Sequence, residues 1–94
     1  MRLALLHTSD AHNRWNEAFV SRLRALKAHH DALLLDSGDA IRAGNVAIPL
    51  RPETAWDWMR IAGYDAMTIG NREFHLTAAG FVAKTRGAPC PLLC

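Results

Sequence analysis

The sequence has few cysteines, no long hydrophobic run and no strong excess of either charge, and each shortage excludes a class of protein. Cys90 and Cys94, the two cysteines, both fall in the last five residues, whereas a disulfide scaffold needs more cysteines spread along the chain. Their spacing is not a common zinc pattern either, so we expect ordinary thiols. No window approaches the roughly 18 apolar residues of a membrane span, so we expect no membrane partner.

The charge is almost balanced, with 11 lysines and arginines against 9 acidic residues and a formal net charge of +2. The basic residues are scattered, so a nucleic-acid polymer is not an expected partner. The apolar stretch after Arg2 is shorter than the roughly 7–15 residues of a signal-peptide core, and we therefore expect a cytoplasmic location. The sequence leaves the oligomeric state open.

Four apolar runs have the character of β-strands. They cover residues 3–8, 32–36 and 66–69, and a fourth begins at Pro91. Because the runs are continuously apolar, we expect strands that are covered on both faces. The chain stops inside the fourth run, so we expect it to be a fragment or a truncated product.

Three helical patterns separate these runs. The first begins at Asn16, the second opens at Pro52 and ends at Gly63, and a weaker third covers residues 77–84. The expected apolar stripe of the second helix consists of Ala55, Trp58, Met59 and Ala62. The resulting order, β-α-β-α-β-α-β, predicts an α/β fold with a mainly parallel sheet and right-handed crossovers.

Polar residues follow each of the first three strands. They are Asp10 and His12, then Asp36, Gly38 and Asp39, then Gly70, Asn71, Arg72 and Glu73. The carboxyl ends of parallel strands meet along one edge of a sheet, so we expect these residues to form one cluster. Each turn alone also has an ordinary explanation, because Asp, Gly and Asn are common turn residues.

The composition of this cluster is typical of a metal site. Carboxylate oxygen and imidazole nitrogen suit Mn²⁺, Fe²⁺ and Zn²⁺ better than Ca²⁺. One carboxylate can bridge two such ions about 3.5–4 Å apart, an arrangement used for phosphoester hydrolysis. The expected cofactors are therefore two divalent ions of the Mn, Fe, Zn or Mg class.

Three segments carry a resemblance to a known family. Residues 8–12 (Thr-Ser-Asp-Ala-His), 35–40 (Leu-Asp-Ser-Gly-Asp-Ala) and 63–74 (Gly-Tyr-Asp-Ala-Met-Thr-Ile-Gly-Asn-Arg-Glu-Phe) resemble the calcineurin-like metallophosphoesterases. His7-Thr8 and the Gly-Tyr-Asp-Ala lead resemble the 5′-nucleotidase and 2′,3′-cyclic-nucleotide phosphodiesterase branch. The resemblance covers essentially the whole chain and implies that residues 1–94 form the N-terminal part of a metallophosphoesterase catalytic domain, with its layered sheet fold.

The resemblance also implies roles for individual residues. Asp10 and His12 would bind the first metal, Asp39 would bridge both metals, and Asn71 would bind the second metal and the phosphate. Family members use further histidines, in Gly-His and Gly-His-x-His motifs, beyond the position where this chain ends. The residues expected to support the site without binding metal are Asp36, which would shape its loop, His7 and Glu73. A histidine within a strand is more often a packed core residue, and this is our preferred interpretation of His7.

Two positions depart from the family pattern. Arg72 replaces the histidine of the usual Gly-Asn-His-Glu motif, and His75 replaces a common aspartate. Histidine has a pKa near 6.5 and can donate a proton at neutral pH, whereas arginine stays protonated up to about pH 12. Arg72 is therefore a poor general acid but a good phosphate ligand. His75 is an alternative acid, although we expect it to be a solvent-exposed residue at a helix start.

The sequence thus favours a metal-dependent hydrolase in which metal-activated hydroxide attacks a nucleotide or related phosphoester held by the metals, Asn71 and Arg72. The alternative is a non-catalytic or degenerate domain that binds metal or phosphate. The replacement at Arg72 and the missing distal ligands both support that alternative. A Rossmann-like nucleotide binder ranks low, because neither G-x-G-x-x-G nor a phosphate-loop motif is present.

Overall fold

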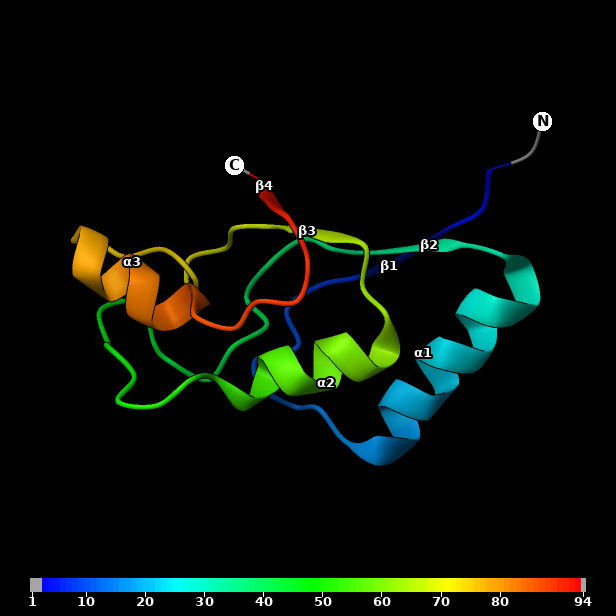
Figure 1. Ribbon diagram of the computed structural model, residues 1–94, viewed down its shortest axis with the longest axis horizontal. Helices are drawn as coiled ribbons and strands as arrows, with labels where there is room; N and C mark the ends of the chain where they lie inside the picture. Colours follow the sequence, from blue (N-terminus) through cyan, green and yellow to red (C-terminus); the bar gives the residue numbers. More distant parts are fainter. Residues whose placement is uncertain (1–2, 94) are drawn as a thin grey trace.

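The computed structural model of the chain describes residues 3–93, so Cys94 lies outside the described part while Cys90 is a free thiol. Strands and helices alternate in these residues. In chain order they are β1 Leu5–Thr8, α1 Glu17–His30, β2 Leu33–Asp36, α2 Thr54–Ala62, β3 Ala66–Thr68, α3 Ala78–Thr85 and β4 Leu92–Leu93. Neighbouring strands pair in parallel, in the order β1-β2-β3-β4 (Figure 1). The predicted α/β fold and its parallel sheet are confirmed.

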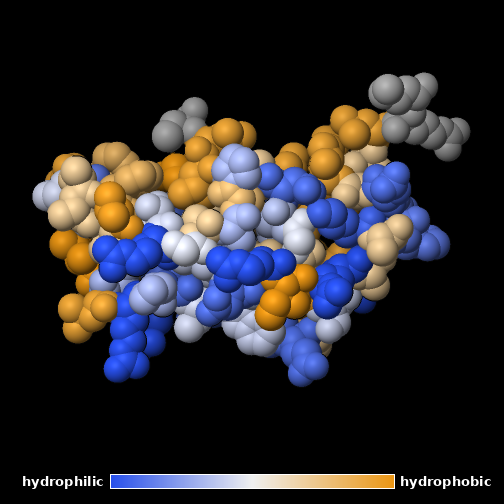
Figure 2. All heavy atoms as spheres, viewed as in Figure 1, coloured by the Kyte–Doolittle hydropathy of each residue, from blue (hydrophilic) through white to orange (hydrophobic). Residues whose placement is uncertain are grey.

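In residues 3–93, helices cover only one face of the sheet. Right-handed crossovers between strands that are ordered as in the sequence all pass over the same face, and α1 and α2 lie together on one side of the sheet (Figure 1). Leu34 and Met67 face these helices and are buried, whereas Leu5 and Leu33 are 55% and 41% exposed. The expectation of strands covered on both faces is therefore wrong. Hydrophobic residues accordingly line the upper edge of Figure 2, over the sheet.

Two helix ends lie where their capping residues predict, whereas α2 begins at Thr54 and not at Pro52. The side chain of Asn16 accepts a hydrogen bond from Phe19 N at 2.8 Å and starts α1. Gly63 ends α2 with a left-handed φ of 86°, which glycine adopts without strain. At this end of the two helices, the Lys27 ammonium donates to the Gly63 carbonyl and pairs with the Asp65 carboxylate at 3.0 Å. The N-terminal cap of α1 and the C-terminal cap of α2 are therefore as expected.

The buried face of α2 differs from the expected stripe by one tryptophan. Trp56, and not Trp58, is the fully buried residue, alongside Ala55, Met59 and Ala62. Its indole Nε1–H donates to the Lys84 carbonyl at 3.0 Å, which joins α2 to α3. Trp58 is half-buried at the border of the core.

Lys84 is a fully buried charged residue that the sequence pattern did not reveal. Its ammonium donates to the carbonyls of Gly44 and Asn45, both at 2.9 Å, and to the Phe74 carbonyl at 3.0 Å. Loss of hydration lowers the pKa of Lys84, while the charges of Glu73 and Glu53 oppose that change. This one side chain fixes the loop after β2 to the segment before α3.

Among the helices of residues 3–93, none has the length and apolar character needed to cross a membrane.

We expect Lys84→Met to lower the free energy of unfolding by about 2–3 kcal/mol, because three buried carbonyls lose their donor. Urea denaturation followed by circular dichroism measures this change. Arg86→Met is the matched control, because Arg86 is exposed just after α3 and should change stability by no more than about 0.5 kcal/mol. Equal losses in the two variants would show that the carbonyl contacts of Lys84 contribute nothing.

Candidate metal centre

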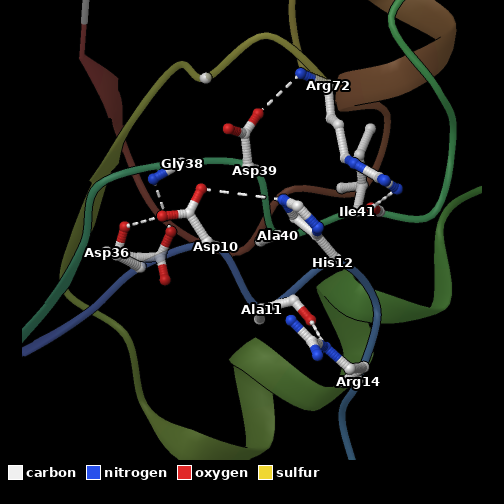
Figure 3. A network of polar contacts seen from close by, with 12 residues as sticks. Asp10, Ala11, His12, Arg14, Asp36, Gly38, Asp39, Ala40, Ile41 and Arg72 are labelled. Carbon is white, nitrogen blue, oxygen red and sulfur yellow. Dashed lines mark hydrogen bonds and ion pairs between the residues drawn. The ribbon is translucent and has the colours of Figure 1, made fainter.

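Three of the predicted metal ligands converge at the carboxyl edge of the sheet. Asp10 and His12 lie in the turn after β1, and Asp39 lies in the turn after β2. Each offers one ligand atom, and these atoms all lie within 4.8 Å of one another (Figure 3). Two carboxylates and one imidazole form a donor set that fits a divalent transition ion.

Asp10 is the more exposed of the two carboxylates, because Asp39 is half-buried. The Asp10 side chain is 62% exposed, and its Oδ1 lies 3.7 Å from His12 Nε2. Its other oxygen accepts a hydrogen bond from the Ser9 hydroxyl at 2.7 Å. This bond is the main cause that lowers the pKa of Asp10, with smaller contributions from the Asp39 side chain and the charge of His12, while loss of hydration opposes them. Asp10 therefore stays ionised and available as a ligand over a wider pH range than an isolated aspartate.

Unusual backbone conformations gather around the same three residues. Left-handed φ values between 48° and 60° occur at Asp10, His12, Asn13 and Asp39. Non-glycine residues seldom adopt this region, although Asn, Asp and His do so most readily. Backbone hydrogen bonds hold the first turn against the second, from His12 N to the Asp39 carbonyl and from Asn13 N to the Ala40 carbonyl, both at 2.8 Å. Such conformations cluster at functional sites when the surroundings hold them in place.

Glu73 is a fully buried carboxylate that joins the second turn to the third. Its Oε1 accepts from Asp39 N at 2.8 Å and from Gly70 N at 2.9 Å. Its Oε2 accepts from Ala40 N at 2.9 Å and from Ile41 N at 3.3 Å. One carboxylate thus satisfies four backbone donors and fixes the peptide that carries the Asp39 side chain.

Two glycines allow these turns to touch backbone to backbone. A Cβ on Gly38, whose φ is 105°, would lie 2.5 Å from Gly70 N. A Cβ on Gly70 would lie 2.6 Å from Asp39 Oδ1. Real Cβ atoms do not approach other atoms so closely, so any larger residue at either position would push the two turns apart. Gly38 meets a conformational requirement as well as a spatial one.

Asp36 lies beneath the cluster rather than within it. It is almost fully buried, and its carboxylate accepts from the Thr8 hydroxyl at 2.5 Å and from Gly38 N at 2.7 Å. Burial raises the pKa of Asp36, and these two hydrogen bonds oppose the rise. The Tyr64 hydroxyl lies 2.6 Å from the Thr8 hydroxyl and completes the network. Sequence reasoning missed Thr8 and Tyr64 as members of it, although both stand in the segments that carry the family resemblance.

Arg72 contacts the second turn with both its backbone and its side chain. Its backbone N–H donates to Asp39 Oδ1 at 2.9 Å. Its guanidinium extends toward Ile41 (Figure 3), where Nη1 donates to the Arg42 carbonyl at 3.1 Å and lies 3.5 Å from the Ile41 carbonyl. The guanidinium has five N–H donors, so the group can bind a further acceptor. Asn71 is exposed in the same turn, between Gly70 and Arg72.

The two remaining histidines considered from the sequence lie apart from these contacts. His7 is exposed on the open face of the sheet, so its interpretation as a packed core residue is wrong. The side-chain alternation of β1 places Thr8 on the covered face and His7 on the other. His75 is partly buried, and its Nδ1 accepts from Thr77 N at 3.0 Å. That bond ties His75 to the start of α3.

Comparison with known proteins gives two partial matches. The chain is 29% identical over 99 aligned residues to a snake venom 5′-nucleotidase of Gloydius brevicauda, an alignment that covers 85% of this chain and 17% of that protein. It is 34% identical over 87 residues to a 5′-nucleotidase of Vibrio cholerae, with coverage of 78% and 16%. The chain therefore spans about a sixth of the length of these relatives. No family model matches the chain.

The contact between the second and third turns can be tested with a matched pair of glycine variants. We expect Gly70→Ala to lower the free energy of unfolding by about 1–3 kcal/mol, because the added methyl group overlaps Asp39. Gly44→Ala is the control, since a Cβ there meets no atom within 4 Å, and its stability should change by less than about 1 kcal/mol. Chemical denaturation measures both values. Similar stabilities for the two variants would contradict the close approach of the turns.

Proposed function

We propose that residues 1–94 form the N-terminal part of the catalytic domain of a metal-dependent phosphoester hydrolase. The observation that carries this proposal is the convergence of Asp10, His12 and Asp39 at one edge of the sheet. The similarity to two proteins named 5′-nucleotidases supports a nucleotide or a related phosphoester as the substrate. In this proposal, Asp10 and His12 would hold one divalent ion, Asn71 would hold a second, and Asp39 would be shared between the two.

The donor set suits this division of roles. Asp39 has two carboxylate oxygens, and its Oδ1 receives the Arg72 N–H, which orients the group without exhausting its lone pairs. Bound ions of this kind supply Lewis-acid activation of water and neutralise charge on the phosphoryl oxygens. The remaining ligands of a complete two-ion site would come from outside residues 1–94.

Arg72 is the residue that we assign to the phosphoryl group, together with Asn71. A guanidinium can donate two charge-assisted hydrogen bonds to phosphoryl oxygens and stabilise the negative charge that develops on them. It does not release a proton near neutral pH. The leaving oxygen must therefore depart without a proton from this position, or take one from another acid.

A second candidate function is a non-catalytic domain that binds a metal or a phosphate. One observation favours it: the Arg72 guanidinium is already bonded to a loop carbonyl. A second observation also favours it. Within residues 3–93, Asp10, His12 and Asp39 form the single cluster of His, Cys, Asp or Glu side chains that could hold a metal ion. These three side chains, together with Asn71, would give two ions only four protein ligands and would therefore hold them weakly.

Metal binding separates these candidates from a protein without a metal site. We expect Mn²⁺ to bind the chain and Asp39→Asn to weaken binding by at least about tenfold, because loss of a ligand costs more than loss of its supporting contacts. Isothermal titration calorimetry measures the affinity. Asp57→Asn is the control, because Asp57 is an exposed carboxylate on α2 that pairs with Arg60. Equal affinities of the two variants would remove Asp39 from the site.

The dependence of the hydrolysis rate on the pKa of the leaving group then distinguishes a hydrolase that has Arg72 from one that has the usual histidine at this position. We expect rates of Mn²⁺-dependent phosphodiester hydrolysis to rise steeply as the leaving-group pKa falls, because no proton comes from Arg72. Initial rates with a series of substituted phenyl esters measure this slope, and Arg72→His should make it shallower. Rates that are insensitive to the leaving-group pKa would show that another residue acts as the acid. Hydrolysis that is absent in both the parent chain and Asp39→Asn would support the non-catalytic candidate.

A further inference from the structure

A network of hydrogen bonds leads from the buried core to the turn that carries Asp10. The Tyr64 hydroxyl lies 2.6 Å from the Thr8 hydroxyl. Thr8 donates to one oxygen of Asp36 at 2.5 Å. Gly38 N donates to the other Asp36 oxygen at 2.7 Å (Figure 3), and the Gly38 carbonyl accepts from Asp10 N at 3.1 Å. Tyr64, Thr8, Asp36 and Gly38 together form the Tyr64 network.

The direction of the hydrogen bonds in this network follows from the carboxylate at its centre. An ionised carboxylate only accepts hydrogen bonds, so the single hydroxyl proton of Thr8 goes to Asp36. The Thr8 oxygen is then an acceptor, and the Tyr64 hydroxyl has to be the donor in the contact between the two hydroxyls. Burial raises the pKa of Tyr64, with a smaller contribution from the charge of Asp36, while the bond to Thr8 opposes the rise. The phenol therefore keeps its proton and remains a donor.

The ring of Tyr64 is held in place by packing that does not involve its hydroxyl. Tyr64 and Trp15 are both buried, and their rings meet edge to face with centroids 5.9 Å apart and planes at 87°. Aromatic pairs favour this geometry. The Trp15 indole Nε1–H donates to the Ala40 carbonyl at 3.0 Å, which fixes the partner ring as well. Loss of the hydroxyl alone, in Tyr64→Phe, should therefore leave the packing intact.

Asp10 needs support through its backbone. Its φ is 55°, in the left-handed region, and its side chain is 62% exposed. A non-glycine residue keeps such a backbone conformation only when its surroundings hold it there. Glu73 supplies this support to the backbone of Asp39, whereas the Tyr64 network ends at the backbone of Asp10. The two carboxylates of the candidate metal centre are thus held by separate sets of contacts.

We propose that Tyr64 is a positioning residue of the metal centre, which acts on Asp10 without touching it. Its hydroxyl directs the Thr8 proton toward Asp36. Asp36 then holds the Gly38 peptide, whose carbonyl sets the place of Asp10. Hydrogen bonds in such a series polarise and strengthen one another, so the loss of the first one weakens the others. This inference rests on the proposed function, in which Asp10 is a metal ligand.

Titration of the chain with Mn²⁺ alone tests the proposal, with the dissociation constant from isothermal titration calorimetry as the measurement. Supporting contacts of metal ligands commonly contribute about 10–100-fold in affinity. Tyr64 acts through two further side chains, so we expect Tyr64→Phe to weaken Mn²⁺ binding by about threefold to tenfold. An affinity equal to that of the parent chain would overturn the proposal.

The conservative exchange at Thr8 provides a rescue. Thr8→Val removes the hydroxyl and should weaken Mn²⁺ binding at least as much as Tyr64→Phe. Thr8→Ser keeps the hydroxyl and should bind within about twofold of the parent chain. Because both hydroxyls act through one series of bonds, the double variant should bind no more weakly than Thr8→Val alone. Equal affinities of Thr8→Val and Thr8→Ser would show that the hydroxyl series does not act on the site.

A matched control separates positioning from a general loss of stability. Trp56→Phe also removes one buried hydrogen bond, from the indole to the Lys84 carbonyl, and this bond takes no part in the Tyr64 network. Urea denaturation should show that Trp56→Phe and Tyr64→Phe are both less stable than the parent chain. Only Tyr64→Phe should bind Mn²⁺ more weakly. A similar loss of affinity in Trp56→Phe would reduce the role of Tyr64 to stability and reject the positioning.

Amide chemical shifts of the metal-free, ¹⁵N-labelled chain distinguish this inference from the proposed function. Tyr64→Phe should shift the amides of Gly38 and Asp10 and leave the amide of Gly70, which bonds to Glu73, in place. Unshifted amides and unchanged affinity in Tyr64→Phe, with Mn²⁺ still bound by the parent chain, would reject the role of Tyr64 and leave the metal centre standing. A parent chain that binds no Mn²⁺ would reject the metal centre and, with it, the role of Tyr64 there.

Discussion

The candidate site depends on the hydrogen bonds between one buried carboxylate and four backbone amides. Glu73 bonds to the second turn at three successive residues, Asp39, Ala40 and Ile41, and to its own turn at Gly70. A buried anion is costly unless it is hydrogen-bonded, and unpaired buried amides are costly as well. Each therefore satisfies the other, and the turn that carries Asp39 has one favourable position against the turn that carries Asn71 and Arg72.

Hydrogen bonds to its backbone also hold the rest of the segment that follows β2. Its carbonyls accept from the backbone of the first turn, from Arg72 and from Lys84, and its amides donate to Glu73 and Glu53. These partners come from segments that are far apart in the sequence. A long connection without regular structure is thereby given fixed geometry, which a site of defined metal spacing requires. The apolar core beneath, which includes Leu34, Met59 and Met67, positions the strands from which the turns project.

Much of this fold follows from features that are local in the sequence. Apolar runs mark the strands, and Asn16 and Gly63 mark helix ends, because capping is decided by neighbouring residues. The convergence of Asp10, His12 and Asp39 was also predictable, since parallel order brings strand ends to one edge. Whether these residues and Asn71 hold metal ions stays a prediction.

The errors arose where several distant elements decide the outcome. Coverage of a sheet face depends on the handedness and direction of every crossover together, and so the exposure of His7 and Leu33 could not be read from their own segments. The buried role of Lys84 depends on carbonyls of loops that no local pattern describes. Glu73 was expected to support the site, but its four amide partners could not be named from the sequence. Trp56 rather than Trp58 lies in the core, because the choice between two tryptophans at the edges of the apolar stripe of α2 is settled by packing and not by periodicity alone.

The sequential strand order has a consequence for how the site can be assembled. Every pairing joins strands whose partner residues lie roughly 30 positions apart, and no later strand inserts between two earlier ones, so the sheet can grow one unit at a time as the chain is synthesised. A nascent chain that has reached Asp39 already holds the three clustered side chains. It does not yet hold Glu73, whose carboxylate orders the turn that carries Asp39. The geometry of the candidate metal centre would therefore be completed only after the third strand has joined the sheet.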